Sequence, residues 1–358
     1  MGNIGQLNLG PVNSGLLKED ALRKSLGLGA QIALENCQNV FQWDRWNCPE
    51  SAFLKKNRQP ANRETAFVRA IIAAGIMHTV AKNCSNGGFG PCGKCQMNPE
   101  DSSNQITANK IYKYLYTNPY TENLTHTASN YRIETLKNGD ESSDILWRWA
   151  ECHNKHIAFG EEIAIKYLDD LDVNGVDLQS YLYLHNNAAG RLAVRATMKK
   201  RCRCHGVSGS CTIQTCWNEL APFSEVAEYL REKYDEAVRV DFDNGVDRLI
   251  VGNVQRTVQD IPLTDLNNLI YLNDSPDYCV ANTTIDWEGT LGRICSKNRS
   301  ENTTKSERRS CKTLCKSCGY RVRKRIRQRQ WRCNCNFQWC CEVTCKTCTE
   351  TVNEFFCE

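Results

Sequence analysis

The sequence has no run of apolar residues long enough to span a membrane. Its first fifteen residues also lack the apolar segment of a secretory leader. Gly2 is compatible with N-terminal myristoylation, but that pattern needs Ser or Thr at position six, where this chain has Gln6. These absences argue against a transmembrane or a myristoylated protein. Because the features below indicate secretion, we expect a mature or truncated chain from which the signal peptide is missing.

Histidine is scarce and cysteine is abundant, with 6 and 22 residues. An even and high cysteine count is typical of disulfides formed in an oxidising compartment. Zinc is the alternative, because C-x-x-C occurs at Cys92/Cys95, Cys315/Cys318 and Cys345/Cys348. No histidine lies in the C-terminal cysteine cluster, however. We therefore predict disulfides, no metal and no dissociable cofactor.

Length and periodicity predict two domains in the 358 residues. The mild net charge of +4 gives no indication of a nucleic-acid partner. Apolar residues recur at helical spacing over 16–36, 63–82, 157–171, 178–198 and 222–238. We predict a disulfide-rich α+β fold: an α-helical domain over 1–252 with a β-hairpin and a polar loop insertion at 97–143, a linker at 253–277, and a small cysteine-rich domain at 278–358 with a long β-hairpin. The last domain shows no helical period and must depend on disulfides.

Residues 201–217, RCRCHGVSGSCTIQTCW, predict a hairpin stapled by two nested disulfides, Cys202–Cys216 outside and Cys204–Cys211 inside. The paired numbers sum to 418 and 415, which implies a bulge. Two glycines in the loop, at positions 206 and 209, supply the positive φ that a tight turn needs. The closed loop holds Ser208 at its tip.

Ser208 has three interpretations. It is a solvated turn residue, a nucleophile or a modification site. GVSGS approaches the G-x-S-x-G pattern, but its last position is Ser and no strand-to-helix elbow is predicted. His205 is also too near in sequence to serve easily as the base. A secreted hydrolase is therefore the alternative function.

The 201–217 stretch closely resembles the signature of the Wnt family of secreted signalling proteins, and the resemblance continues over nearly the whole chain. It implies a ligand rather than an enzyme, with a palmitoleoyl group attached to Ser208 by the acyltransferase Porcupine. It also implies carriage by Wntless, binding to the cysteine-rich domain of a Frizzled receptor with an LDL-receptor-related co-receptor, and activation of Wnt signalling in development. The expected location is the extracellular space and extracellular matrix. The 97–143 insertion departs from the family pattern.

A second hairpin is predicted near the C-terminus. Cys333–Cys348 and Cys335–Cys345 sum to 681 and 680 and nest around Cys340-Cys341. In this register Phe337 faces Val343, and Phe337 shares a face with Trp339 if the strand is unbroken. The aromatic tip either packs the turn or anchors a partner.

The resemblance supports a vicinal Cys340–Cys341 bond and a tip that opposes the lipid-bearing hairpin across the receptor domain. The receptor contacts implied are His205, Gly206, Val207, Ser208, Gly209, Phe337, Trp339, Cys340, Cys341 and Val343. Local spacing predicts Cys37–Cys48 and Cys84–Cys92, and elimination predicts Cys95–Cys152. The resemblance adds Cys279–Cys318, Cys295–Cys311 and Cys315–Cys357.

Six N-x-S/T sequons agree with secretion. We expect glycans at Asn83 and Asn282, with Asn123, Asn298 and Asn302 as further candidates, whereas Pro276 makes Asn273 a poorer acceptor. Alternating arginines, at 321, 323, 325, 327 and 329, have two interpretations that remain open. They form either a solvated edge strand or a patch for a polyanion, which for a secreted protein means heparan sulfate.

Overall fold

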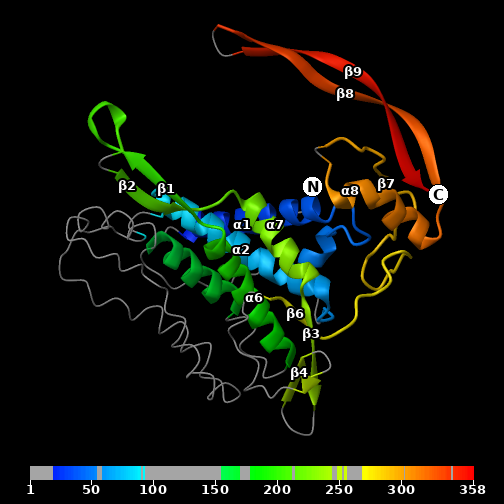
Figure 1. Ribbon diagram of the computed structural model, residues 1–358, viewed down its shortest axis with the longest axis horizontal. Helices are drawn as coiled ribbons and strands as arrows, with labels where there is room; N and C mark the ends of the chain where they lie inside the picture. Colours follow the sequence, from blue (N-terminus) through cyan, green and yellow to red (C-terminus); the bar gives the residue numbers. More distant parts are fainter. Residues whose placement is uncertain are drawn as a thin grey trace. The chain divides into compact units, whose positions relative to one another are not determined.

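Two units divide the chain in a computed structural model (Figure 1). The first unit comprises Met1–Cys37 and Ala52–Ser275, and the second comprises Gln38–Ser51 and Pro276–Glu358. The structure describes residues 19–54, 59–89, 92, 155–169, 178–211, 214–243, 248–251, 254–255, 268–301, 303–339 and 342–358. The predicted 97–143 insertion, Cys95 and Cys152 lie outside these residues.

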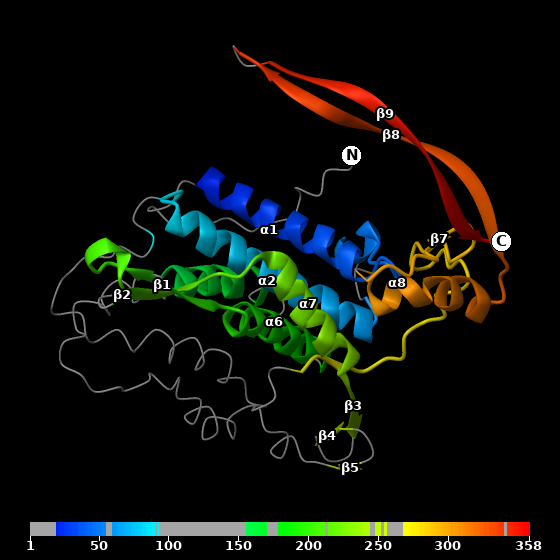
Figure 2. The same ribbon diagram turned by 45° about the horizontal axis from the view of Figure 1, so that its top comes forward.

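The helices of the first unit form close to the segments where apolar periodicity predicts them. They are α1 (Glu19–Val40), α2 (Arg63–Ser85), a helix over 155–164 that continues into the π turn Ile165–Asp169, α6 (Leu178–Ala196) and α7 (Phe223–Asp235); a short 3-10 turn spans Glu50–Phe53. In Figure 2, α2 runs between α1 and α6. It is therefore the central helix of this unit.

The burial of α2 corrects one sequence prediction. Within the described residues, α2 is long and apolar enough to cross a membrane, although the sequence analysis found no such segment. However, 83% of its most apolar window is buried inside the protein. A helix that is apolar on all sides is typical of a protein core as well as of a membrane, and here its neighbours cover it.

Two glycine contacts let helix backbones touch. A Cβ at Gly75 in α2 would lie 2.4 Å from the carbonyl oxygen of Gly29 in α1. A Cβ at Gly190 in α6 would lie 1.9 Å from the carbonyl oxygen of Ala70 in α2. Both distances are shorter than any real Cβ contact, so no larger residue fits while the helices keep these positions.

Buried polar side chains fix α6 against its neighbours. Asn186 donates through Nδ2 to the carbonyl of Ile270 and accepts from the Ile270 amide through Oδ1. Arg191 and Asp169 form a buried ion pair at 2.9 Å. The half-buried His185 ring lies 2.9 Å from the carbonyl of Asn268. Removing either member of the buried ion pair would leave a charge without compensation.

A four-stranded sheet in the first unit is absent from the sequence predictions. Its order is β5–β4–β3–β6, formed by Val254–Gln255, Arg248–Val251, Val238–Asp243 and Ile270–Tyr271. β3 and β4 are antiparallel, whereas β6 is parallel to β3. Both β5 and β6 lie in the segment predicted as a linker, and the first unit extends to Ser275.

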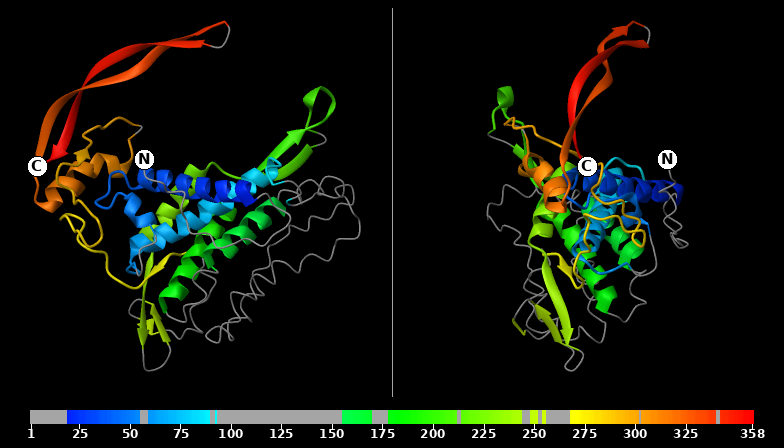
Figure 3. Two further views of the ribbon diagram at one scale, coloured as in Figure 1. Left: turned by 180° about the vertical axis from the view of Figure 1, so that it is seen from behind. Right: turned by 90° about the vertical axis from the view of Figure 1, so that its right-hand side faces the viewer.

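The second unit combines a short helical segment with a three-stranded sheet. The strands are β7 (Ile294–Cys295), β9 (Glu342–Cys357) and β8 (Val322–Gln338), in the order β7–β9–β8. β8 and β9 form a long curved ribbon (Figure 3). The helical segment is α8 (Lys305–Ser310), followed by a π turn over Cys311–Cys315 and a 3-10 turn over Lys316–Cys318.

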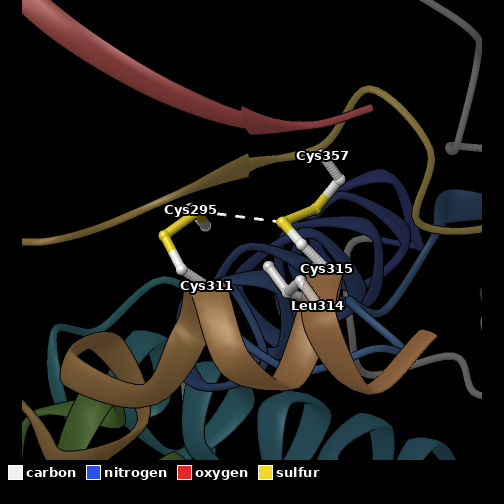
Figure 4. Close-up of a cluster of buried hydrophobic side chains, with 5 residues drawn as sticks. All are labelled: Cys295, Cys311, Leu314, Cys315 and Cys357. Atoms are coloured by element: carbon white, nitrogen blue, oxygen red, sulfur yellow. Dashed lines mark hydrogen bonds between the residues drawn. A yellow bond between two sulfur atoms is a disulfide. The ribbon is translucent and has the colours of Figure 1, made fainter. Parts of the chain in front are cut away.

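This helical segment corrects the prediction that the C-terminal domain has no helical period. Cys311, Leu314, Cys315 and Cys318 recur at helical spacing, so cysteines occupy the positions that aliphatic residues normally hold. Disulfides Cys295–Cys311 and Cys315–Cys357 pack with Leu314 in a small core (Figure 4). The Sγ atoms of Cys315 and Cys295 lie 3.8 Å apart. Cystine sulfur therefore supplies much of the core of this unit.

The described residues contain seven of the disulfide pairs that the sequence analysis names: Cys84–Cys92, Cys204–Cys211, Cys279–Cys318, Cys295–Cys311, Cys315–Cys357, Cys333–Cys348 and Cys335–Cys345. Cys37, Cys48 and Cys202 are also disulfide-bonded. Both members of the C-x-x-C pairs Cys315/Cys318 and Cys345/Cys348 are bonded in this way. These thiols are therefore not zinc ligands.

Candidate functional site

The first hairpin follows α6 almost directly along the chain. Its strands are β1 (Lys199–Cys204) and β2 (Gln214–Glu219), and Cys202 faces Cys216 in an unbroken antiparallel register. The predicted bulge is therefore wrong. The inner disulfide, Cys204–Cys211, lies beyond the last paired residues and closes the loop instead of crossing the ladder.

The loop backbone places Ser208 in an unusual conformation. Ser208 has φ 60° and ψ 25°, and Gly209 has φ 77°. The sequence analysis expected the two glycines to supply the positive φ, but Gly206 is not among the residues that have one. The left-handed region costs a residue with a side chain about 1–2 kcal/mol. Ser208 itself therefore carries backbone strain.

Two backbone hydrogen bonds and the inner disulfide offset this strain. The Gly206 amide donates to the carbonyl of Ser210 at 2.9 Å, and the Gly209 amide donates to the carbonyl of Gly206 at 2.9 Å. The one-turn helix Val207–Gly209 lies between these bonds. Ser208 is exposed. The arrangement presents a primary hydroxyl on a loop of defined shape.

The surroundings of Ser208 differ from those of a hydrolase nucleophile. The residue lies between two antiparallel strands, whereas a nucleophile elbow joins a strand to a helix. His205, in the same loop, is exposed. Among the described residues, no group of three or more His, Cys, Asp or Glu side chains could hold a metal ion. The hairpin therefore lacks the strand-to-helix geometry of a nucleophile elbow.

The second hairpin ends in an apolar tip that protein atoms barely cover. Phe337 faces Val343 across the ladder, which confirms the predicted pairing. The exposed fractions are 68% for Phe337, 60% for Val343 and 96% for Trp339. β8 ends at Gln338, so Trp339 lies in the turn and not on a continuous strand. Cys340 and Cys341 lie outside the described residues.

Two disulfides flank an irregularity in this ribbon. The register shifts between Cys333 and Asn336, and Cys333 faces Lys346 although it bonds to Cys348. The Cys335–Cys345 bond lies within the irregular part. A two-stranded ribbon has little stability alone, so these bonds hold the tip in register.

Comparison with models of known protein families identifies the family of the chain that carries these two hairpins. The Wnt family model matches residues 14–358. The chain belongs to the Wnt family. Its members are signalling ligands of development, so the family resemblance stated from residues 201–217 is confirmed.

Individual Wnt proteins are similar to this chain over most of its length. Protein Wnt-8a of Danio rerio is 41% identical over 347 residues, which cover 94% of this chain and 83% of that protein. Protein Wnt-8a of Homo sapiens is 40% identical over 341 residues, which cover 93% of this chain and 84% of that protein. These values relate the chain to Wnt-8 proteins in particular.

A solved structure supports the fold of this Wnt family chain. A chain in the structure of human WLS in complex with WNT8A matches with a TM-score of 0.63 and 36% identity, covering 94% of both chains. The predicted disulfide-rich α+β fold class is therefore confirmed.

The arginine-rich face of β8 is largely compensated within this Wnt ribbon. Arg325 pairs closely with Glu354, Arg327 pairs with the same carboxylate at 3.6 Å, and Arg323 pairs with Glu358 at 2.5 Å. Glu350 faces Arg329 across the ladder. Carboxylates from β9 and from Glu358, the residue after it, thus neutralise much of the charge that a polyanion would need, which favours the interpretation as a solvated strand.

The described sequons differ in how accessible their amides are. Asn83 is half-buried at the end of α2, where its Nδ2 donates to Ser25 Oγ at 2.8 Å. Asn282 and Asn298 use only Oδ1, each accepting from the amide two residues later, at 2.9 and 3.1 Å. Of these three, the geometry favours Asn282 and Asn298 as acceptors. Asn123 and Asn302 lie outside the described residues.

Proposed function

We propose that this Wnt family chain is a secreted ligand that carries a palmitoleoyl group on Ser208. The observation that carries the proposal is the exposed Ser208 hydroxyl on a loop closed by Cys204–Cys211. An acyltransferase such as Porcupine needs an accessible hydroxyl, and a loop that is already ordered lowers the cost of binding it. Each buried methylene of an acyl chain contributes about 0.8 kcal/mol, so a long chain can dominate a groove contact.

We also propose that both hairpins bind the cysteine-rich domain of a Frizzled receptor. The second hairpin supports this through the exposed Phe337, Trp339 and Val343. Large apolar side chains on a tip are costly in water unless a partner covers them, and aromatic residues are common anchors of protein interfaces. A co-receptor of the LDL-receptor-related class completes the proposed signalling complex.

The proposed route of secretion uses Wntless as the carrier. The support is the likeness to the chain in the human WLS–WNT8A complex, which covers nearly the whole of both chains. A carrier is physically reasonable, because a long acyl chain on an exposed loop would otherwise bind membranes non-specifically.

The decisive experiment compares two serines of the same loop. Ser208→Ala and Ser210→Ala each remove one exposed hydroxyl, two residues apart. Each protein is secreted from cells with a leader, and its intact mass and Wnt reporter activity are measured. We expect Ser208→Ala to lose the palmitoleoyl mass and all signalling, and Ser210→Ala to keep both.

Peptide mapping of the Cys204–Cys211 bond checks that the loop is closed in both variants. Secreted Ser208→Ala protein that signals fully would contradict the proposal. Turnover of ester substrates by wild-type protein without an acyl mass would instead favour the hydrolase.

A further inference from the structure

The stem of the first hairpin concentrates positive charge beside the proposed acylation site. We define the basic stem as Lys199, Lys200, Arg201 and Arg203 of β1, all of which are exposed. Residues 204–218 contain no Asp, Glu, Lys or Arg. The positive charge of the hairpin is therefore confined to its stem, and its tip carries none of these charged residues. Within 199–219 the only carboxylate is that of Glu219.

Part of this charge is compensated locally and part is not. Lys199 pairs with Glu225 at 2.5 Å, and Arg201 pairs closely with Glu219. Among the ion pairs of the described residues, none includes Lys200 or Arg203. The β8 face differs, because Glu354 of β9 and Glu358, just after β9, pair with three of its arginines.

The two uncompensated cations lie on opposite faces of the ribbon. Successive residues of a strand point to opposite faces, so Lys200 shares a face with Cys202 and Arg203 lies on the other. A protein groove contacts mainly one face of a ribbon, whereas a layer of lipid headgroups surrounds an inserted stem on all sides. The distribution therefore favours a headgroup layer as the partner.

The spacing along the strand agrees with this partner. A strand rises about 3.3 Å per residue, so Lys200 lies roughly 13 Å and Arg203 roughly 3 Å from the end of β1. The screening length at physiological salt is about 8 Å. With an acyl chain inserted from Ser208, at least Arg203 would lie within range of the charged headgroups.

We infer that the basic stem binds anionic phospholipid headgroups, so that the Ser208 acyl chain and the stem form a two-part membrane anchor. This inference rests on the proposed acylation of Ser208. A single acyl chain gives only marginal membrane binding, and a second signal such as a basic patch makes the attachment stable. The stem supplies that second signal.

The experiment measures binding of the acylated full-length chain to phosphatidylcholine vesicles with and without phosphatidylserine. Each basic residue near an anionic surface contributes about 1 kcal/mol, so Lys200→Gln/Arg203→Gln should weaken binding to the anionic vesicles by up to about thirtyfold. Binding to pure phosphatidylcholine should not change. The matched control is Lys312→Gln/Lys316→Gln, which removes two exposed lysines from the second unit and should leave both affinities unchanged.

Intact mass separates the two proposals. If wild-type protein lacks the acyl mass, the proposed function fails. If it is acylated but binds both vesicle types equally, only the basic-stem inference fails. If the stem variant loses affinity for an isolated Frizzled cysteine-rich domain in detergent and keeps its affinity for anionic vesicles, the stem contacts protein and the inference is also overturned.

Discussion

Both hairpins of this protein present exposed residues at their tips, but their strands differ in length. The first has strands of 6 residues, a regular register, one disulfide that closes its loop, a further bonded cysteine in β1, Cys202, and one cross-strand ion pair. The second has strands of 17 and 16 residues, an irregular register, two internal disulfides and cross-strand ion pairs. Ser208 and Trp339, at the two tips, are both exposed. The difference teaches that the bonded cysteines of the short hairpin accompany a regular ladder, whereas those of the long hairpin hold an irregular register in place.

Opening the loop of the first hairpin should have the largest effect. Cys204→Ala/Cys211→Ala removes a bond that closes a short loop, worth about 2.5 kcal/mol in the chain-entropy model. If the acyltransferase must then order the loop, acylation of Ser208 should fall more than about tenfold. The acylated fraction is measured by intact mass of the secreted protein.

The matched control opens the other hairpin. Cys333→Ala/Cys348→Ala should leave Ser208 acylation at the wild-type level, since that bond supports the second tip only. Full acylation of the Cys204→Ala/Cys211→Ala protein would show that the inner bond has no role in presenting Ser208.

Truncating the second tip should have the next largest effect. Burial of a large apolar side chain contributes about 1.5–3 kcal/mol, so Trp339→Ala should weaken binding to the Frizzled cysteine-rich domain about ten- to a hundredfold. The affinity of acylated protein is measured. Trp331→Ala, within β8 and away from the tip, should have little effect. Unchanged affinity after Trp339→Ala would assign this ring to packing of the turn.

A pH effect should distinguish the helices that support the first hairpin from the second unit. His78 in α2 is buried, its Nε2 lies 2.9 Å from the carbonyl of Ala221, and its ring contacts Phe223 of α7. Burial lowers the pKa of His78, and nearby Lys82 lowers it further, against the effect of the hydrogen bond. The unfolded chain therefore binds a proton more readily than the folded chain. Stability is present above about pH 6.5, the ordinary histidine pKa, and is lost as the pH falls below it.

Urea unfolding at about pH 7.5 and about pH 5.5, which bracket that ordinary pKa, tests this effect. His78→Gln keeps a hydrogen-bond donor and should reduce the difference in unfolding free energy between the two conditions. The sequence of the second unit contains no histidine, so its unfolding should change less across this range. An identical pH response of wild type and His78→Gln would exclude this histidine as the cause.

Breaking the ion pairs of the second hairpin should have the smallest effect. Glu354→Gln removes the partner of both Arg325 and Arg327. Pairs of this kind contribute less than about 1 kcal/mol each when they are exposed, so the unfolding free energy should fall only slightly. The same substitution should increase binding to a heparin column if compensation is what limits a polyanion site there. Unchanged retention would show that the carboxylate does not mask the arginines.

Much of the first unit could be predicted because its helices bury continuous apolar stripes. The sheet formed by β3 to β6 could not, since β5 and β6 have only two residues each and β6 pairs in parallel with the distant β3. The helical turn around Leu314 was missed because cysteines at 311, 315 and 318 were counted as cross-links and not as apolar residues.

At the site, spacing sufficed for the disulfides but not for the loop backbone. Cysteine positions predicted the nested hairpins, since bonded residues must lie near each other across a ladder. They could not predict that Ser208, and not Gly206, takes a positive φ. That choice depends on hydrogen bonds between backbone atoms, which are nearly independent of side-chain identity. The sequence likewise could not show which cations of β1 have ion-pair partners. The structure pairs Lys199 and Arg201 but gives Lys200 and Arg203 no ion pair among the described residues.

The glycine contact between α6 and α2 has a mechanical consequence. Only Thr197 and Met198 separate the end of α6 from β1, so a pull on the tip of the first hairpin loads α6 along the chain. Gly190 sits against the Ala70 carbonyl of α2, so a movement of α6 that brought one of its Cβ atoms to this point would meet the α2 backbone. Force applied at Ser208 would therefore reach α2 through a contact between helix backbones at Gly190, with no side chain between them to deform.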